Sequence, residues 1–314
     1  MQAQKKHRKL LLYLAKVIVA ILVTLILIRK ISLDEIIFAL HTADRWLIAA
    51  GFSLVVVNLG FQFRKWQLIV HRENRDIPAR SVLGSLLVGM ALGLITPGRV
   101  GEFGRSFFIR GADWARLMAL TFIDKMIALG IIYLFGLYGF YRFMVDTLHP
   151  YVLWPILITI SIFLIILFLF LLRPNLLQSI TQRIPNRLKH PVLHKLASGI
   201  ELATPKLTMR LLLYTILQNL TFCTQMVLLI RAFYPAIGLE AYTAVFAVMM
   251  TKTLLPISLG DLGIRESASV YFFSRLNVPH AAAFDASLLL FMINVLLPAL
   301  IGLFIFIKKR MPRE

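Results

Sequence analysis

Pro97-Gly98-Arg99-Val100-Gly101-Glu102-Phe103-Gly104-Arg105 places helix-breaking and charged residues inside an otherwise apolar part of the chain. A second stretch, Pro256-Ile257-Ser258-Leu259-Gly260-Asp261-Leu262-Gly263-Ile264-Arg265, has the same order of proline, glycine, acid, apolar residue, glycine and arginine, with one residue inserted. Its proline follows the first by 159 positions (256 minus 97) in a chain of 314 residues. This recurrence at about half the chain length predicts an internal repeat.

Long apolar runs surround both stretches. The chain is 59% apolar with a mean hydropathy of +0.80, and a helix needs about 20 apolar residues to cross a bilayer core of about 30 Å. The sequence therefore predicts an all-α, polytopic membrane protein that forms a single transmembrane domain over residues 1–314, with no soluble domain. Spans are expected at about 10–28, 46–69, 117–141, 152–172, 208–233 and 281–307. The two broken pieces are Val82 to Ile95 with Phe103 to Ile109, and Ala244 to Leu259 with Ala268 to Phe273.

The distribution of lysine and arginine predicts the orientation. The net charge of +19 reflects basic residues in short loops, which gather on the cytoplasmic side of membrane proteins. No nucleic-acid partner is therefore expected. An inside N-terminus places the basic connector 174–206 inside only if each broken piece enters and leaves on one side, as a re-entrant hairpin or a pair of spans. Residues 142–151 and 234–241 are then outside. Both termini are expected to be cytoplasmic, in the cell membrane.

This topology makes the two units inverted repeats. Each unit is a span, a broken re-entrant hairpin and a span, covering about 46–141 and about 208–307. Between them lie an extra span and an amphipathic connector, together 152–206. Apolar residues recur at helical spacing in the connector with basic residues between them, so we expect it on the inner surface, facing anionic headgroups. A solvated surface helix is the alternative.

Charged residues at the breaks indicate a site near the middle of the membrane. Inverted repeats with paired Gly/Pro-interrupted segments are typical of transporters, and a charge at the centre of a membrane helix costs about 2.5–3.5 kcal/mol. A helix restarting at Gly101 or Gly260 would point its positive end at an anion. The candidate substrate-binding residues are Arg99, Arg105, Arg265, Gly101, Gly104, Gly260 and Gly263. Their candidate charge partners are Glu102, Asp261, Glu266, Asp124, Lys125 and Lys252.

Two readings of this network are open. In the first, the arginines bind a ligand, with Arg99 or Arg105 within reach of Asp261 or Glu266, and Arg265 within reach of Glu102. In the second, the network only holds the two halves together.

Two segments resemble the signature loops of the lysylphosphatidylglycerol synthase transmembrane-region family. They are residues 96–102 together with Arg105, and residues 260–266, which include Asp261. A second glycine is common in that family where this chain has Asp261. The resemblance covers about residues 10–307. It implies a stand-alone member that resembles the flippase domain and lacks the soluble synthase domain. The resemblance therefore implies lipid translocation or lipid handling, and not lysyl transfer.

No catalytic signature is found in the sequence. The seven histidines show no metal-ligand spacing, and there is no phosphate loop, cofactor fingerprint or nucleophile elbow. No cofactor, metal or enzymatic activity is therefore expected. The leading hypothesis is translocation of a phosphate-bearing lipid, a phospholipid or a polyprenyl-phosphate type, with anionic membrane lipids as partners. The alternatives are a small-anion transporter, a membrane-embedded lipid-modifying transferase, and a non-catalytic partner of a lipid-modifying enzyme or glycosyltransferase.

Overall fold

A computed structural model describes residues 34, 38, 41–96, 98–172, 191–255 and 261–308. Within these ranges the secondary structure is helical and contains no strand, as predicted. The expected first span at 10–28 and the candidate residue Gly260 lie outside the described residues.

Five helices of the described part are long and apolar enough to cross a membrane. They are α3 (Arg45–Glu73), α5 (Trp114–Met144), α6 (Pro150–Leu172), α9 (Pro205–Phe233) and the continuous run His280–Lys308. The last run consists of α12 (His280–Phe291), the π-helical turn η2 (Met292–Leu296) and α13 (Leu297–Lys308). These positions agree with the five later predicted spans, and they confirm a multi-pass helical membrane protein.

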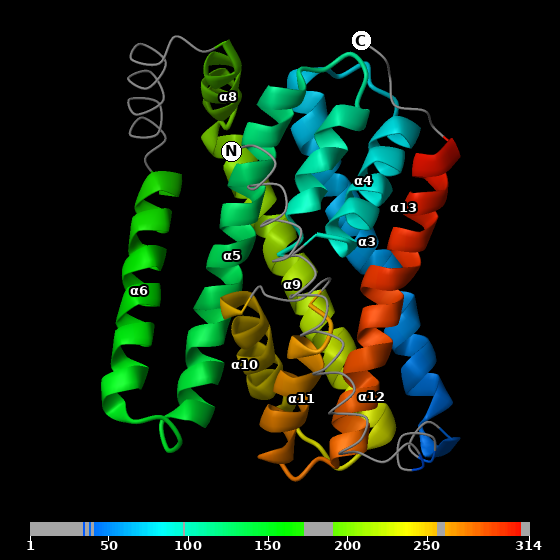
Figure 1. Cartoon of the computed structure of the whole chain (residues 1–314), viewed down its shortest axis with the longest axis vertical. Coiled ribbons are helices and arrows are strands. Elements are labelled where there is room, and N and C mark those ends of the chain that lie inside the picture. The colour runs from blue at the N-terminus through cyan, green and yellow to red at the C-terminus, as the bar shows by residue number, and fades with distance from the viewer. Residues whose placement is uncertain are drawn as a thin grey trace, which may run out of the picture.

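Each broken piece forms two short helices. In the first, α4 (Ala79–Leu94) is followed by the 3-10 helix η1 (Val100–Phe108). In the second, α10 (Ala241–Leu254) is followed by α11 (Ile264–Ser274). At 1.5 Å per residue, the 16 residues of α4 extend only about 24 Å, less than a bilayer core. Figure 1 shows α4 near one end of the long axis and α10 with α11 near the other.

Each pair of short helices packs against the last helix of the other half of the chain. At Gly302 of α13, an added Cβ would meet the carbonyl group of Leu87 on α4. At Gly139 of α5, an added Cβ would lie 2.6 Å from the carbonyl oxygen of Thr243 on α10. Such glycines let the backbones of membrane helices approach closely. This close packing stabilises the association of the helices, because lipid supplies little hydrophobic driving force for it. The two halves are therefore interlocked and not merely adjacent.

The helices α3 and α9 run antiparallel beside each other. The backbone N–H of Asp44 donates to the carbonyl of Ala232 at one end of the pair, over 2.8 Å. Lys65 Nζ donates to Thr215 Oγ1 further along, over 3.2 Å. The Asp44 carboxylate also accepts from the backbone N–H groups of Trp46 and Leu47, which caps the first turn of α3.

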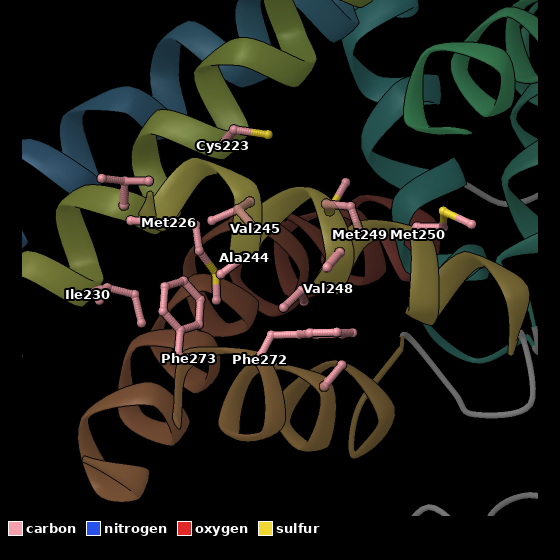
Figure 2. Packing of buried hydrophobic residues seen from close by; sticks show 14 of the residues in the cluster. Cys223, Met226, Ile230, Ala244, Val245, Val248, Met249, Met250, Phe272 and Phe273 are labelled. Carbon is pink, nitrogen blue, oxygen red and sulfur yellow. The ribbon is translucent and has the colours of Figure 1, made fainter. Parts of the chain in front are cut away.

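A hydrophobic core fixes the second pair of short helices. Figure 2 shows Val245 and Val248 of α10 facing Phe272 and Phe273 of α11, with Met226 and Ile230 of α9 close by. A second core surrounds the buried Trp66 and joins α3, α4, α5 and the start of α9. The two cores leave the region between them to polar side chains.

The described part of the predicted amphipathic connector is α8 (Pro191–Glu201). It packs on the start of α5, where Arg116 Nε donates to Ser198 Oγ over 3.1 Å. Lys195 Nζ lies 2.9 Å from the carboxylate of Asp113, which caps α5. Partial burial would raise the pKa of Asp113, but the hydrogen bonds from Lys195 and from the backbone of α5 outweigh it and lower that pKa. The basic side chain of Lys195 thus contacts protein.

Candidate functional site: a charged cavity between the two short-helix pairs

The first loop is held by a threonine and by close backbone contacts. Gly98 and Arg99 have positive φ angles of 60° and 57°. Thr96 Oγ1 accepts from the backbone N–H of Gly101 over 2.7 Å and donates to the carbonyl of Leu92 over 3.0 Å. A Cβ at Gly101 would meet that same Leu92 carbonyl. The loop therefore needs glycine at 101 to fold tightly against the end of α4.

Two glycines on α4 make room for the charged side chains of η1. A Cβ at Gly93 would lie 2.7 Å from Glu102 Cγ, and one at Gly89 would lie 2.8 Å from Arg105 Cβ. The 3-10 helix has three residues per turn, so residues 99, 102 and 105 share one face. The spacing Gly-x-x-x-Gly of Gly89 and Gly93 in α4 is a sequence signal for this packing. Gly104 packs against the side chain of Leu92.

In the second loop, Arg265 and Glu266 bond to each other. Asp261 has a φ of 66° and Gly263 a φ of 84°. Aspartate tolerates this left-handed conformation better than most residues, which explains why an aspartate can stand at position 261. Glu266 accepts from the backbone N–H of Gly263 over 2.6 Å and from Arg265 Nη2 over 2.5 Å. Arg265 Nε also donates to Ser287 Oγ of α12, over 3.2 Å.

A cavity of about 390 Å³ lies between the two loops. Its described charged lining consists of the cations Lys65, Arg99, Arg105, Lys125 and Lys252 and the carboxylates Glu102, Asp124 and Asp261. Five cations and three carboxylates leave two positive charges in excess. The lining also contains polar side chains of Asn58, Gln62, Gln218, Asn219, Thr253 and Asn294.

Seven of the predicted site residues are brought together in this lining, while Arg265, Glu266 and the glycines 101, 104 and 263 are not part of it. Lys65 also lines the cavity, although its place near the end of the long apolar run 46–69 predicts only a simple span. In the structure it is buried, and its Nζ lies 3.0 Å from Asp124 Oδ1.

The ion pairs link neighbours of the same half of the chain. Lys252 Nζ lies 3.0 Å from Asp261 Oδ2, and Lys125 Nζ contacts Glu102 Oε2. Arg99 Nη2 lies 2.6 Å from Glu102 Oε1. Arg99 pairs with Glu102 and Arg265 with Glu266, so the predicted reach of Arg265 to Glu102 is corrected. Across the two loops, the charge of Arg99 acts on the carboxylate of Asp261, as predicted.

Arg105 is buried without saturating its donors. It is 5% exposed, and its guanidinium carbon lies 4.1 Å from the centre of the Trp66 ring. Its Nη2 is 3.9 Å from Asp124 Oδ2, too long for a hydrogen bond. Among the described residues, Nε and Nη2 of Arg105 and Nε of Arg99 have no hydrogen-bond partner. A buried guanidinium with free donors is suited to bind an anion.

A chain of amide side chains borders the cavity. Asn294, in the π-helical turn η2, donates to Gln225 Oε1 over 2.8 Å and accepts from Asn58 over 3.3 Å. These hydrogen bonds link α3, α9 and the π-helical turn. Pro298 lacks an N–H group and so interrupts the regular helix hydrogen bonds just beyond this turn. Such π-turns are frequent at functional sites.

Within the described residues, no group of three His, Cys, Asp or Glu side chains could hold a metal ion.

These features define a class of protein: a multi-pass helical membrane protein with a charged cavity between two broken helix pairs. The chain belongs to the family described as the lysylphosphatidylglycerol synthase TM region, whose model matches residues 13–302. Comparison with curated proteins and with solved structures gave no match. Membership in this family assigns the chain a membrane function related to lipids.

Proposed function

We propose that this protein translocates a phosphate-bearing lipid, of phospholipid or polyprenyl-phosphate type, between the two leaflets through the charged cavity. The observation that carries the proposal is the pair of arginines in the lining. Arg99 and Arg105 have guanidinium donors that no described residue accepts, and both line the cavity. Planar guanidinium groups match the geometry of phosphate oxygens.

The apolar part of the lining supports a lipid as the ligand. Ala128, Leu129 and Ile132 of α5 form one apolar surface, and Phe222, Met249 and Val295 add to it from α9, α10 and η2. Beside the loop, Ile95 and Val100 are 55% and 64% exposed. A lipid presents phosphate and hydrocarbon together, whereas a small soluble anion needs no apolar wall. This favours a lipid over the alternative of small-anion transport.

The arrangement of the short helices supports alternating access between inverted repeats. We interpret α4 with η1, and α10 with α11, as re-entrant hairpins that open to opposite sides. Figure 1 places these pairs toward opposite ends of the molecule. The reciprocal contacts of Gly302 with Leu87 and of Gly139 with Thr243 fit a pseudo-twofold relation. A rocking of one repeat against the other would expose the cavity to each leaflet in turn.

The proposal includes a cell-membrane location with both termini cytoplasmic. Arg72 donates to the carbonyl of Leu202, and Arg116 lies 3.3 Å from Glu73. These contacts gather the basic ends of α3, α5 and α8 at one end of the molecule. That end would face the cytoplasm by the positive-inside rule.

The test is a leaflet-resolved assay in proteoliposomes. Purified protein is reconstituted with headgroup- or tail-labelled phosphate lipids, and the fraction accessible to a membrane-impermeant quencher is followed over time. We expect transfer that is faster than in protein-free vesicles and is reduced by Arg105→Gln. Arg110→Gln, an exposed arginine beyond η1, is the matched control and should transfer normally. Equal rates with and without protein for every phosphate lipid would refute the proposal. A chemically altered lipid in the extract would favour the transferase.

A further inference from the structure

We infer that the cavity is selective for a phosphate monoester, which carries close to two negative charges, over phosphodiester and zwitterionic headgroups. This inference rests on the proposed function for the lipid's passage, but it concerns equilibrium binding and can be tested without transport. The ligand class comprises lipids that end in a monophosphate, such as phosphatidate or a polyprenyl monophosphate.

The charges in the lining pair off in a way that leaves two arginines in excess. Lys65 pairs with Asp124 and Lys252 with Asp261, each at 3.0 Å, and Lys125 contacts Glu102. Three lysines thus neutralise three carboxylates. The remaining charges are those of Arg99 and Arg105. Arg99 shares Glu102 with Lys125, and Arg105 lies 3.9 Å from a carboxylate already paired with Lys65.

Uncompensated charge in a low-dielectric site is costly, and the cost is relieved by a ligand of equal and opposite charge. A monoester phosphate carries about −1.5 to −2 at neutral pH, because its second pKa is about 6. A phosphodiester carries one negative charge, and a zwitterionic headgroup has none in excess. Only the monoester therefore comes close to matching the two excess charges.

The free donors match the same ligand. Nε and Nη2 of Arg105 and Nε of Arg99 have no hydrogen-bond partner among the described residues. A monoester presents three terminal oxygens, whereas a diester presents two, since its other oxygens are substituted. The ring of Trp66 under Arg105 is fixed by its own hydrogen bond, from Nε1 to Ser85 Oγ over 2.8 Å. The guanidinium plane is therefore oriented before the ligand arrives.

The experiment measures binding of defined lipids to the purified protein in detergent or nanodiscs. The lipids are phosphatidate and a short polyprenyl monophosphate, against phosphatidylglycerol and phosphatidylcholine with the same acyl chains. We expect both monoesters to bind at least about tenfold more tightly than either comparison lipid, the change given by one charge-assisted hydrogen bond. Equal affinity for phosphatidate and phosphatidylglycerol would overturn the inference.

Two variants test the charge count separately. Arg99→Gln and Arg105→Gln each remove one excess charge, so each should bind phosphatidate and phosphatidylglycerol with nearly equal affinity. Arg99→Gln should disturb folding less than Arg105→Gln, because the Arg99 side chain is 26% exposed whereas Arg105 is packed on Trp66. Arg110→Gln should keep the full preference. If Arg99→Gln kept the monoester preference, the pairing scheme would be wrong.

Free ligands separate the lipid from its headgroup. Inorganic phosphate and glycerol phosphate should compete only weakly with phosphatidate, since they leave the apolar wall unfilled. If inorganic phosphate displaced phosphatidate at equal concentration, the site would be one for a soluble anion, and the lipid assignment would fall. Monoester preference without leaflet transfer would refute the proposed transport and leave this inference standing. Leaflet transfer without any monoester preference would refute this inference and leave the proposed transport standing.

Discussion

Lys65 Nζ lies 3.0 Å from Asp124 Oδ1, and this ion pair joins α3 to α5 beside the cavity, with each side chain 7% exposed. Removing Asp124 leaves Lys65 without its buried partner, and removing Lys65 leaves Asp124 with only the more distant Arg105 among the described residues, at 3.9 Å. Breaking a buried ion pair from one side costs about 3–5 kcal/mol. We therefore expect Lys65→Met and Asp124→Asn each to lower the thermal stability in detergent strongly. The double variant should lose clearly less than the sum of the two. Strictly additive losses in this double-mutant cycle would mean that the two groups are not coupled.

Asp285 in α12 is 1% exposed, and neither carboxylate oxygen has a hydrogen-bond partner among the described residues. An unsatisfied buried polar group costs about 1–3 kcal/mol. Asp285→Leu should therefore leave the protein as stable as the wild type or raise its free energy of unfolding by about that amount. Asp124→Leu is the matched control and should destabilise, because it strands Lys65. Loss of transport in a stable Asp285→Leu protein would instead give this carboxylate a role in translocation.

Gly302→Ala places a methyl group against the Leu87 carbonyl, and overpacking of this kind costs about 1–3 kcal/mol. We expect a lower unfolding temperature and a separation of α13 from α4. Gly60→Ala provides the control, because a Cβ there meets no described atom within 4 Å. In an exposed helix position, alanine should stabilise by about 0.5–1 kcal/mol. The close-packing interpretation would fail if both alanines had the same effect.

The two matching arginines should respond differently to lysine. Arg265 is bonded to Glu266 and Ser287 and lies 5.3 Å over the ring of Phe291, so Arg265→Lys should lower thermal stability. Arg105→Lys keeps a positive charge near Asp124 but loses the planar donors, so it should fold and lose lipid binding. Unfolding temperature and phosphatidate affinity, measured on the same preparations, distinguish the outcomes. A stable Arg265→Lys with weakened binding would place Arg265 at the site.

Single cysteines in a Cys223→Ser background test the topology. Asp146→Cys and Leu239→Cys should react with an impermeant thiol reagent from outside, because the proposed orientation places 142–151 and 234–241 there. Asp76→Cys and Glu201→Cys, which are also exposed, should react only after the membrane is permeabilised. Labelling of residue 146 from the inside alone would rule out the proposed inverted repeat.

The sequence was sufficient to predict the five spans that lie in the described residues, because continuous apolar runs report length directly. The predicted run 208–233 corresponds to Pro205–Phe233, and 46–69 to Arg45–Glu73. It also marked the charged loops and the neighbours Asp124 and Lys125, which the structure places in the cavity lining.

The sequence could not predict that Arg105 of the first loop lines the cavity while Arg265 of the second loop does not, since the two motifs are nearly identical. This difference depends on Glu266 and Ser287, which accept from the donors of Arg265, whereas Nε and Nη2 of Arg105 have no hydrogen-bond partner among the described residues. Glu266 is the neighbour of Arg265 in α11, but Ser287 comes from α12, and Trp66, on which Arg105 packs, comes from α3. Lys65 was hidden for a similar reason, because only tertiary packing shows that its ammonium turns inward to Asp124.

The contact between Leu87 and Gly302 joins positions 215 residues apart (302 minus 87). At a synthesis rate of ~5–20 residues per second, roughly 10–45 s pass between the making of the two segments. During that time α4 enters the membrane without α13 beside it, so the insertion machinery or another segment must shield the surface that α13 will cover. Biogenesis is therefore the stage at which a weakened α13 does the most harm, so variants such as Gly302→Ala should accumulate in the membrane at a lower level than the wild type.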